Sequence, residues 1–212
     1  MRRYGIPHGI DSDTVALWRF AAGSPLVDDV GTFALQAITA LPPLGVGPFG
    51  EGHGMKNGTG LYTPDGPAIT AAMTVDGWFM FADFTSTHYP IDRYAAGPDR
   101  SFSVAVTGTD GNIFARLTDG ATAWQSSNTL RALTVARWYY LRAAFTPSGD
   151  FRLFVNGELW LRELHGLAAL RADNDWYFQG STGSRAHVRV RDVADLDPDT
   201  CSPNLSPWHV GA

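Results

Sequence analysis

The sequence is poor in the residues that form cross-links and long surface helices. Of its 212 residues, one is Cys, one is Lys and three are Glu, against 15 Arg and 18 Asp. The single Cys201 excludes an internal disulfide. Helix surfaces favour Lys and Glu, whereas turns favour Asp. With 23 Gly and 13 Pro, this composition predicts an all-β fold of strands joined by many turns.

An excess of positive charge is also missing. The formal net charge is −5, which argues against a nucleic-acid partner, because such proteins carry a basic excess. No apolar run approaches the roughly 18 residues of a membrane-spanning helix, so we expect no membrane insertion. The N-terminus has two Arg but no apolar stretch typical of a signal peptide, so we expect no secretion signal. The length and 44% hydrophobic residues predict one compact domain.

Alternating apolar and polar residues predict the strands. Asn156-Gly157 separates two such runs and is typical of a type I′ hairpin turn, because both residues tolerate φ > 0. The one helical candidate is 163–171. The predicted strands and hairpins lie at 14–20, 73–81, 102–107, 112–118, 138–161, 176–181 and 186–193.

Several of these runs resemble a known family. The stretch ARWYYLRAAFTPSGDFRLFVNGEL (136–159) is similar to the signature hairpin of the laminin G-like and pentraxin-like jelly rolls, within the concanavalin A-like lectin/glucanase superfamily. Further resemblances lie in VALWRF (15–20), the acidic loop 28–31, MTVDGWFMF (73–81) and AHVRVRDVADLD (186–197).

The resemblance implies a two-sheet antiparallel jelly-roll β-sandwich, with Trp18, Trp78 and Trp138 in or near its core. We expect an N-terminal arm (1–13), the jelly-roll domain (14–197) and a C-terminal tail (198–212).

The sequence predicts no enzymatic activity. Glycosidases of the resembled fold need two carboxylates that point into one cleft, and only Glu158 and Glu163 form a close Glu pair. Their odd spacing predicts that they lie on opposite faces of one strand. The six histidines show no metal-ligand spacing, and no nucleophile elbow or phosphate loop is present.

Calcium is the one cofactor that the sequence suggests. Asp28, Asp29, Asp173 and Asp175, with Asn174, offer the hard oxygen ligands that Ca²⁺ prefers. In the resembled family an acidic loop after the first strand sometimes helps to hold calcium. The alternative is turn chemistry, because Asp and Asn side chains also bond their own backbone.

Aromatic side chains in or beside predicted loops are candidates for glycan binding, because a sugar face can stack on an aromatic ring. The alternative is that these rings pack in the core. The candidate ligand-binding residues are Tyr89, Trp124, Trp160, Trp176 and Asn174.

The biological role is predicted from these features together. Both ends carry apolar residues among Pro and Gly, a composition suited to docking on other subunits. We therefore expect a structural or adhesion protein of a bacteriophage or phage-like virion, assembled in the host cytoplasm, as a capsid decoration, spike or tail appendage. It would contact virion subunits through both termini and could bind a host cell-surface glycan. The alternative is a lectin-like module of a non-viral bacterial protein, extracellular or on the cell surface.

Overall fold

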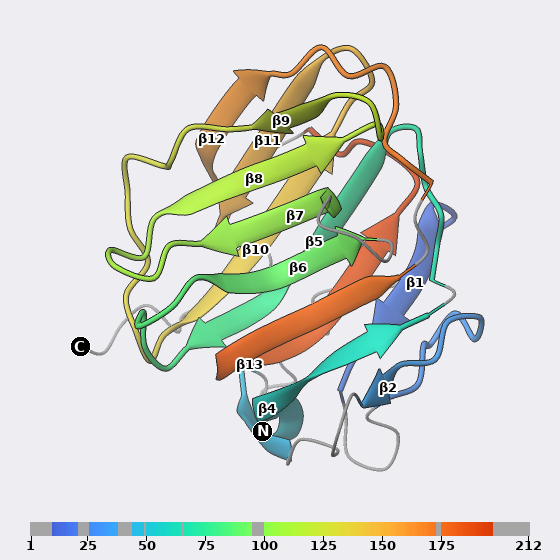
Figure 1. Cartoon of the computed structure of the whole chain (residues 1–212). Helices are drawn as coiled ribbons and strands as arrows, with labels where there is room; N and C mark the ends of the chain where they lie inside the picture. The colour runs from blue at the N-terminus through green and yellow to red at the C-terminus, as the bar shows by residue number, and fades with distance from the viewer. Residues whose placement is uncertain are drawn as a thin grey trace.

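The protein is a two-layer antiparallel β-sandwich in a computed structural model (Figure 1). This confirms the predicted fold class. The structure describes residues 10–20, 26–37, 44–48, 50–64, 66–94, 100–172 and 175–196. The predicted arms, 1–13 and 198–212, lie outside these residues except for 10–13.

The strands are numbered along the chain. They are β1 (Thr14–Trp18), β2 (Gln36–Ala37), β3 (Leu44–Gly47), β4 (Gly50–Thr63), β5 (Met73–Phe81), β6 (His88–Tyr94), β7 (Arg100–Val106), β8 (Ile113–Thr118), β9 (Ala123–Gln125), β10 (Trp138–Phe145), β11 (Asp150–Val155), β12 (Glu158–Leu164) and β13 (Trp176–Arg191).

One strand belongs to both layers. The order β12-β11-β10-β5 forms one layer and β6-β7-β8-β9 the other, and β13 lies between β5 and β6 (Figure 1). Its first part pairs with β6 through Gln179, and its later part pairs with β5 from Gly183 onward. On its other side β13 pairs with β4 and then with β1. The two sheets are therefore joined by hydrogen bonds along a single strand.

The core follows from strand alternation. Alternate residues of each strand point to one face, so one set of apolar side chains fills the space between the layers. Trp18 lies fully buried there, as predicted. Trp78 is also buried, but it packs with Tyr140 and Ala186 in a separate cluster, and Trp138 contacts that cluster.

The predicted hairpin over 138–161 is confirmed. Asn156 and Gly157 both have positive φ, 51° and 86°, as a type I′ turn requires. The Asn156 carboxamide also accepts a hydrogen bond from the Tyr140 amide at 2.9 Å, which fixes the turn against β10.

Other local predictions were wrong or incomplete. The strands expected at 176–181 and 186–193 are one strand, β13. The helix expected at 163–171 is absent, because β12 continues to Leu164, which pairs with Asp150, and Gly166 then takes a φ of 72°. The sequence patterns did not predict β2, β3, β4, β6 or β9. Within the described part of the chain, no helix has the length and apolar character needed to cross a membrane.

Candidate functional site

Charged side chains form a row on the outer face of one sheet. Arg142 of β10 lies opposite Asp76 of β5, which lies opposite Arg189 of β13. The neighbouring row, Tyr140, Trp78 and Ala186, is the cluster separate from the main core, so both rows lie on the face turned away from that core. Asp76 and Arg142 have at most 1% of their surface exposed.

A β-bulge sets this arrangement. The pairing of β13 with β5 is irregular between Ala186 and Arg189, and His187 there has a φ of 49°. Because the bulge inserts one extra residue, Ala186 and Arg189 share the outer face, while Val188 packs in the core.

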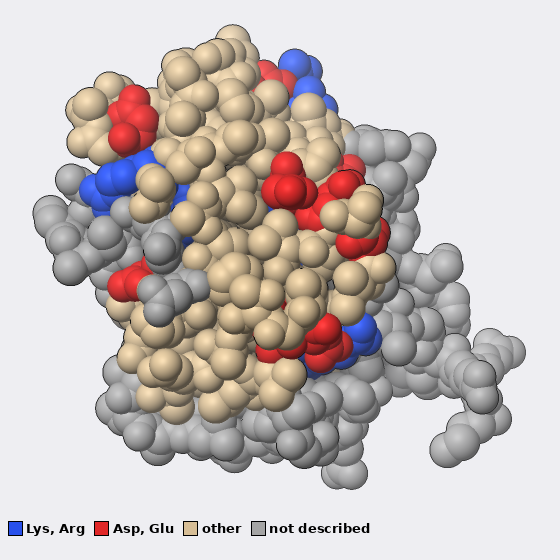
Figure 2. Space-filling model, turned by 90° about the vertical axis from the view of Figure 1, so that its right-hand side faces the viewer, with Lys and Arg blue, Asp and Glu red and all other residues tan. Residues whose placement is uncertain are grey.

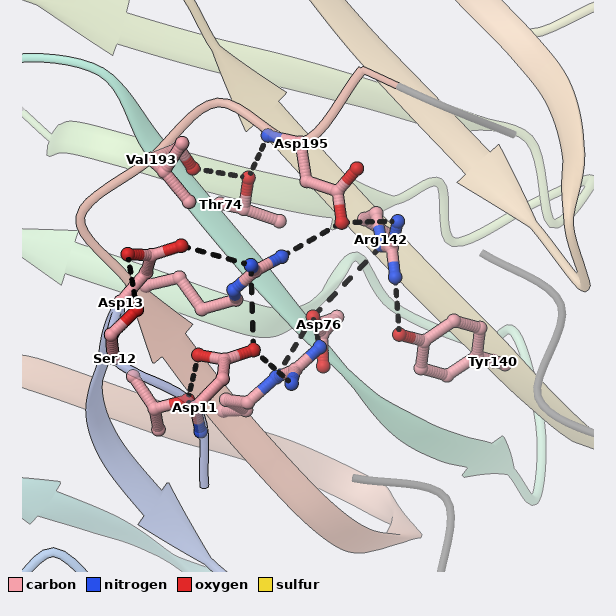
Figure 3. Close-up of polar contacts among 12 residues, drawn as sticks. Asp11, Ser12, Asp13, Thr74, Asp76, Tyr140, Arg142, Val193 and Asp195 are labelled. Atoms are coloured by element: carbon pink, nitrogen blue, oxygen red, sulfur yellow. Dashed lines mark hydrogen bonds and ion pairs between the residues drawn. The ribbon is translucent and has the colours of Figure 1, made fainter. Parts of the chain in front are cut away.

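Ion pairs link the row to both ends of the described chain (Figure 3). We call the following residues the anchor cluster: Asp11, Asp13, Asp76, Arg142, Arg189, Arg191 and Asp195. Asp76 accepts from Arg189 Nη2 at 3.0 Å, and its Oδ2 lies 3.9 Å from Arg142 Nε. Asp195 accepts from Arg142 at 2.9 Å and from Arg191 at 2.7 Å.

The segments before β1 and after β13 therefore attach to the same sheet face. Arg191 Nη2 lies 3.4 Å from carboxylate oxygens of both Asp11 and Asp13. After β13, the Asp195 amide donates to the Thr74 hydroxyl at 2.8 Å, and that hydroxyl donates to the Val193 carbonyl at 2.6 Å (Figure 3).

The pKa shifts in the cluster favour its charged pairs. Burial raises the pKa of Asp11, but the Thr14 hydrogen bond and the Arg191 and Arg189 charges outweigh it, so the pKa lies below 3.8. Burial lowers the pKa of Arg189, but the Asp76 carboxylate outweighs this effect, so the pKa lies above its ordinary value. Both shifts favour the charged forms of Asp11 and Arg189, and the ion pairs attach the segments before β1 and after β13 to the sheet.

The sequence patterns did not predict the anchor cluster. A signal was present, because Asp76 and Arg142 alternate with apolar core residues in two strands. To predict that these two side chains lie opposite each other, one needs the register between β5 and β10, and these strands lie far apart in the sequence.

Of the predicted ligand-binding aromatic residues, Trp176 must be corrected. Its side chain is fully buried, its Nε1 donates to the Pro67 carbonyl at 3.0 Å, and Arg93 lies over its ring. Trp176 is a core residue, because its place in the alternation of β13 directs it between the layers.

Trp124 and Tyr89 are partly covered. The Trp124 ring packs against Phe151 and His165, with centroids 5.9 and 5.7 Å away. The Arg100 guanidinium lies 3.9 Å over the Tyr89 ring, so one face of that ring is occupied. The remaining predicted ligand residue, Asn174, is outside the described residues.

Trp160 lies at an exposed rim of the sandwich. It is half-buried on the edge strand β12, where it packs against the main core, and its Nε1 donates to Glu158 Oε2 at 3.4 Å. Arg131, from the loop after β9, pairs with the same carboxylate, and its guanidinium lies over one face of the Trp160 ring, 5.9 Å from the ring centroid. We call Arg131, Glu158 and Trp160 the rim site.

The predicted orientation of Glu158 and Glu163 was wrong. A bulge at Trp160 places Glu158 opposite Val155 and Glu163 opposite Phe151, so the two Glu share one side of β12. Four strand positions of about 3.3 Å separate them, about 13 Å, which is longer than the 6.5–9.5 Å of inverting glycosidases. Glu163 instead bonds Ser127 of the loop that also carries Arg131.

The acidic loop after β1 uses its carboxylates locally. Asp28 is buried and accepts hydrogen bonds from the amides of Leu17, Val30, Thr32 and Phe33. Asp29 pairs with Arg19.

The other predicted calcium ligands do not form a site in the described part of the chain. Asp173 lies outside the described residues, and Asp175 is half-buried. No group of three or more His, Cys, Asp or Glu side chains suited to a metal occurs among the described residues. Calcium binding stays a prediction.

On the side of the molecule that carries β1, charged groups gather in small separate patches on a mainly uncharged surface (Figure 2).

Two antiparallel sheets that share the bulged strand β13 define the class of the fold as a jelly-roll β-sandwich, and a family match agrees with this class. Residues 55–193 match a laminin G-type family described as the concanavalin A-like lectin/glucanases superfamily, and the chain belongs to this family. No curated protein matches the sequence.

Solved structures share the fold at low identity. The binding domain of botulinum neurotoxin serotype D is 14% identical, with a TM-score of 0.68 over 89% of this chain and 49% of that one. The serotype G binding domain is 12% identical, with a TM-score of 0.70 over 90% and 50%. A serotype D domain solved in complex with N-acetylneuraminic acid is 13% identical, with a TM-score of 0.68 over 89% and 49%. The chain spans about half the length of these structures.

Proposed function

We propose that the protein is a non-catalytic, lectin-like binding protein that holds a glycan at the rim site. The observation that carries the proposal is the placement of Trp160 on an edge strand, with the Glu158 carboxylate at its Nε1 and the Arg131 guanidinium over one face of its ring, both more than half exposed. A botulinum neurotoxin serotype D domain that shares this fold over about half of its length was solved in complex with N-acetylneuraminic acid, which supports a sugar as the ligand class.

The chemistry of the rim site suits a sugar. An indole ring stacks on the apolar face of a pyranose. The Glu158 carboxylate accepts from sugar hydroxyls, and the Arg131 guanidinium donates to them. Because Arg131 and Glu158 already bond each other, they are held in place before a ligand arrives, which lowers the entropy cost of binding.

A glycan array with the full chain tests this proposal. Trp160→Ala should lower affinity for any bound glycan at least tenfold, whereas Trp160→Phe should retain part of it through stacking. Leu164→Ala is the matched control, since Leu164 is exposed on the same strand without a polar partner. Equal binding by wild type and Trp160→Ala would remove the rim site from the proposal.

We also propose that the protein serves as a structural or adhesion subunit of a bacteriophage or phage-like virion, with its termini on neighbouring subunits. The anchor cluster supports this, because it fastens the segments that lead to both termini onto one sheet face and so fixes where the termini leave the domain. A lectin-like module of a non-viral bacterial protein is the alternative. Mass spectrometry of purified particles decides between them: a fixed copy number supports the virion role, and absence from particles contradicts it.

A further inference from the structure

After β12 the chain crosses one end of the sandwich before it enters β13 (Figure 1). We call residues 165–171 of this crossing the end flap. Leu167 is 3% exposed and packs in the main core, and its carbonyl accepts from the Ser148 amide at 2.6 Å. The Arg171 amide donates to the Thr118 carbonyl at 2.9 Å. The flap is therefore fastened to the turn after β10 in one sheet and to the end of β8 in the other.

His165 begins the flap and lies between aromatic rings of both sheets. Its imidazole stacks on Phe145 of β10, with ring centroids 4.8 Å apart, and meets Trp124 of β9 edge to face at 5.7 Å. Its Nδ1 accepts a hydrogen bond from the Leu167 amide at 3.0 Å. An imidazole nitrogen accepts only when it carries no proton. The closed flap thus contains a hydrogen bond that requires the neutral form of His165.

Charged groups approach His165 from two strands. Asp150 of β11 faces it, and Arg152 and Arg162 already bond this carboxylate. On β12, Glu163 bonds the loop after β9 instead. The two rings that β9 and β10 place against the imidazole are uncharged. The Asp150 carboxylate is therefore the charge that favours a protonated ring, and its own arginine partners oppose its effect.

The net balance favours the neutral ring. Burial lowers the pKa of His165, and nearby backbone groups and the Asp150 charge oppose this effect only in part, so the pKa lies below 6.5. The stability that the neutral ring contributes is fully present above pH 6.5, and it is lost as the pH falls through the lower pKa of the folded protein.

We propose that the end flap is an acid-sensitive closure and that His165 is its trigger. Protonation places a hydrogen on Nδ1, opposite the amide hydrogen of Leu167, so two donors face each other in place of the hydrogen bond. The flap then separates from the end of the sandwich and uncovers Leu167 and Leu170, which are both buried in the closed form. This closure does not depend on glycan binding at the rim site.

Hydrogen–deuterium exchange of the full chain, read by mass spectrometry from pH 7.5 to 5.0, tests the proposal. Exchange times are corrected for the intrinsic pH dependence of amide exchange. In the wild type we expect peptides from the flap to lose protection about tenfold as the pH falls, while peptides from β7 and β8 keep theirs. His165→Asn should abolish this loss, because an Asn side chain accepts from the amide two residues on and does not titrate. His165→Phe should leave the flap less protected at every pH, without a pH response.

His88→Phe is the control, since His88 is a buried histidine that packs on Phe81 and Phe84 instead of the flap, and its flap should respond to acid as the wild type does. Three results would overturn the proposal. They are unchanged flap protection in the wild type over this pH range, an equal loss in His165→Asn, and a loss that β7 and β8 share, which would indicate acid unfolding of the whole domain.

Discussion

Asp92 is a buried carboxyl group on β6, opposite Ser103 of β7. Its side chain is 1% exposed, its Oδ1 has no hydrogen bond, and its Oδ2 accepts from Arg100 Nε at 2.9 Å. Burial raises the pKa of Asp92 to about 6, and the Arg100 charge only partly opposes this effect. The folded protein therefore holds a proton on Asp92 at a pH where the unfolded chain has released it.

This residue predicts a pH-dependent loss of stability. The protonated Asp92 side chain makes its full contribution to the free energy of unfolding below pH 3.8. This contribution is lost as the pH rises through about 6, because the buried carboxyl group then ionises. Relative to wild type, Asp92→Asn should thus gain stability between pH 3.5 and 7.5, by about 3 kcal/mol. Urea unfolding across this range measures the difference.

Asp150→Asn provides a control of opposite sign. Hydrogen bonds from Arg162 and Arg152 hold the pKa of Asp150 below 3.8, so its contribution is present above that pH and is lost as the pH falls. Asp150→Asn should lose stability relative to wild type as the pH rises. If the free energies of unfolding of the two variants, relative to wild type, changed with pH in the same direction, the assigned directions of the two pKa shifts would be contradicted.

Trp176 and Trp160 show which residue-level predictions a sequence supports. Both tryptophans lie next to turn-like sequence and have polar neighbours, so the local sequence predicts an exposed side chain for each of them. Trp176 lies inward because strand β13 begins at that residue, and Trp160 lies at the rim because a bulge interrupts β12 there. Composition identified the aromatic candidates, but the register that decides their exposure depends on strands distant in sequence.

At the scale of elements, β13 passes unusually close to β5 at Gly183. A Cβ atom built on Gly183 would lie 2.4 Å from the Met80 carbonyl oxygen, which is backbone and cannot rotate away. Only glycine therefore permits the strand to change sheets at this position.

Gly183→Ala should destabilise the fold by about 1–3 kcal/mol, because the strands must separate to admit the methyl group. Chemical denaturation measures the loss. Gly149→Ala is the matched control, since its added Cβ would meet Thr146 at 3.3 Å and a small adjustment relieves that contact. An equal effect of both substitutions would show that the β13 crossing tolerates a side chain.

Local hairpins were predictable, and bulges were not. The 138–161 hairpin carries its own turn signal in Asn156-Gly157, so neighbouring residues alone determine it. The bulges at His187 and Trp160 have no such signal, since neither residue is a glycine and each extra residue is placed by the partner strand. The orientation of Glu158 and the composition of the anchor cluster both depended on these bulges.

At the scale of the whole molecule, Arg191 connects the two ends of the described chain. Its Nη2 reaches Asp11 and Asp13, and its Nη1 reaches Asp195. Arg191→Met removes these contacts together while the adjacent Asp76–Arg189 pair remains.

Limited proteolysis with subtilisin, followed by mass spectrometry, tests this connection. In the wild type we expect trimming to stop outside residues 10–196, whereas in Arg191→Met it should continue to the start of β1 and to the end of β13. Arg19→Met is the control, because Arg19 pairs with Asp29 away from the cluster. Identical products from Arg191→Met and wild type would show that other contacts hold the ends.

The overall architecture was predicted by family resemblance more than by periodicity. Alternation identified the strongly patterned β5, β7, β8 and β10, whereas the glycine-rich β4 and the proline-containing β6 have weak strand patterns. These two strands are placed by pairing with β13, a contact between distant residues that composition does not encode.

The position of β13 near the end of the sequence also constrains the order in which the strands can pair during synthesis. A ribosome releases β1, β4, β5 and β6 well before β13, yet each of these strands needs β13 as a partner. During synthesis the nascent chain carries several unpaired strand edges, which are sites of aggregation. We therefore expect the two layers to join only after β13 has left the ribosome, and we expect cellular yield to respond to chaperones that cover these edges.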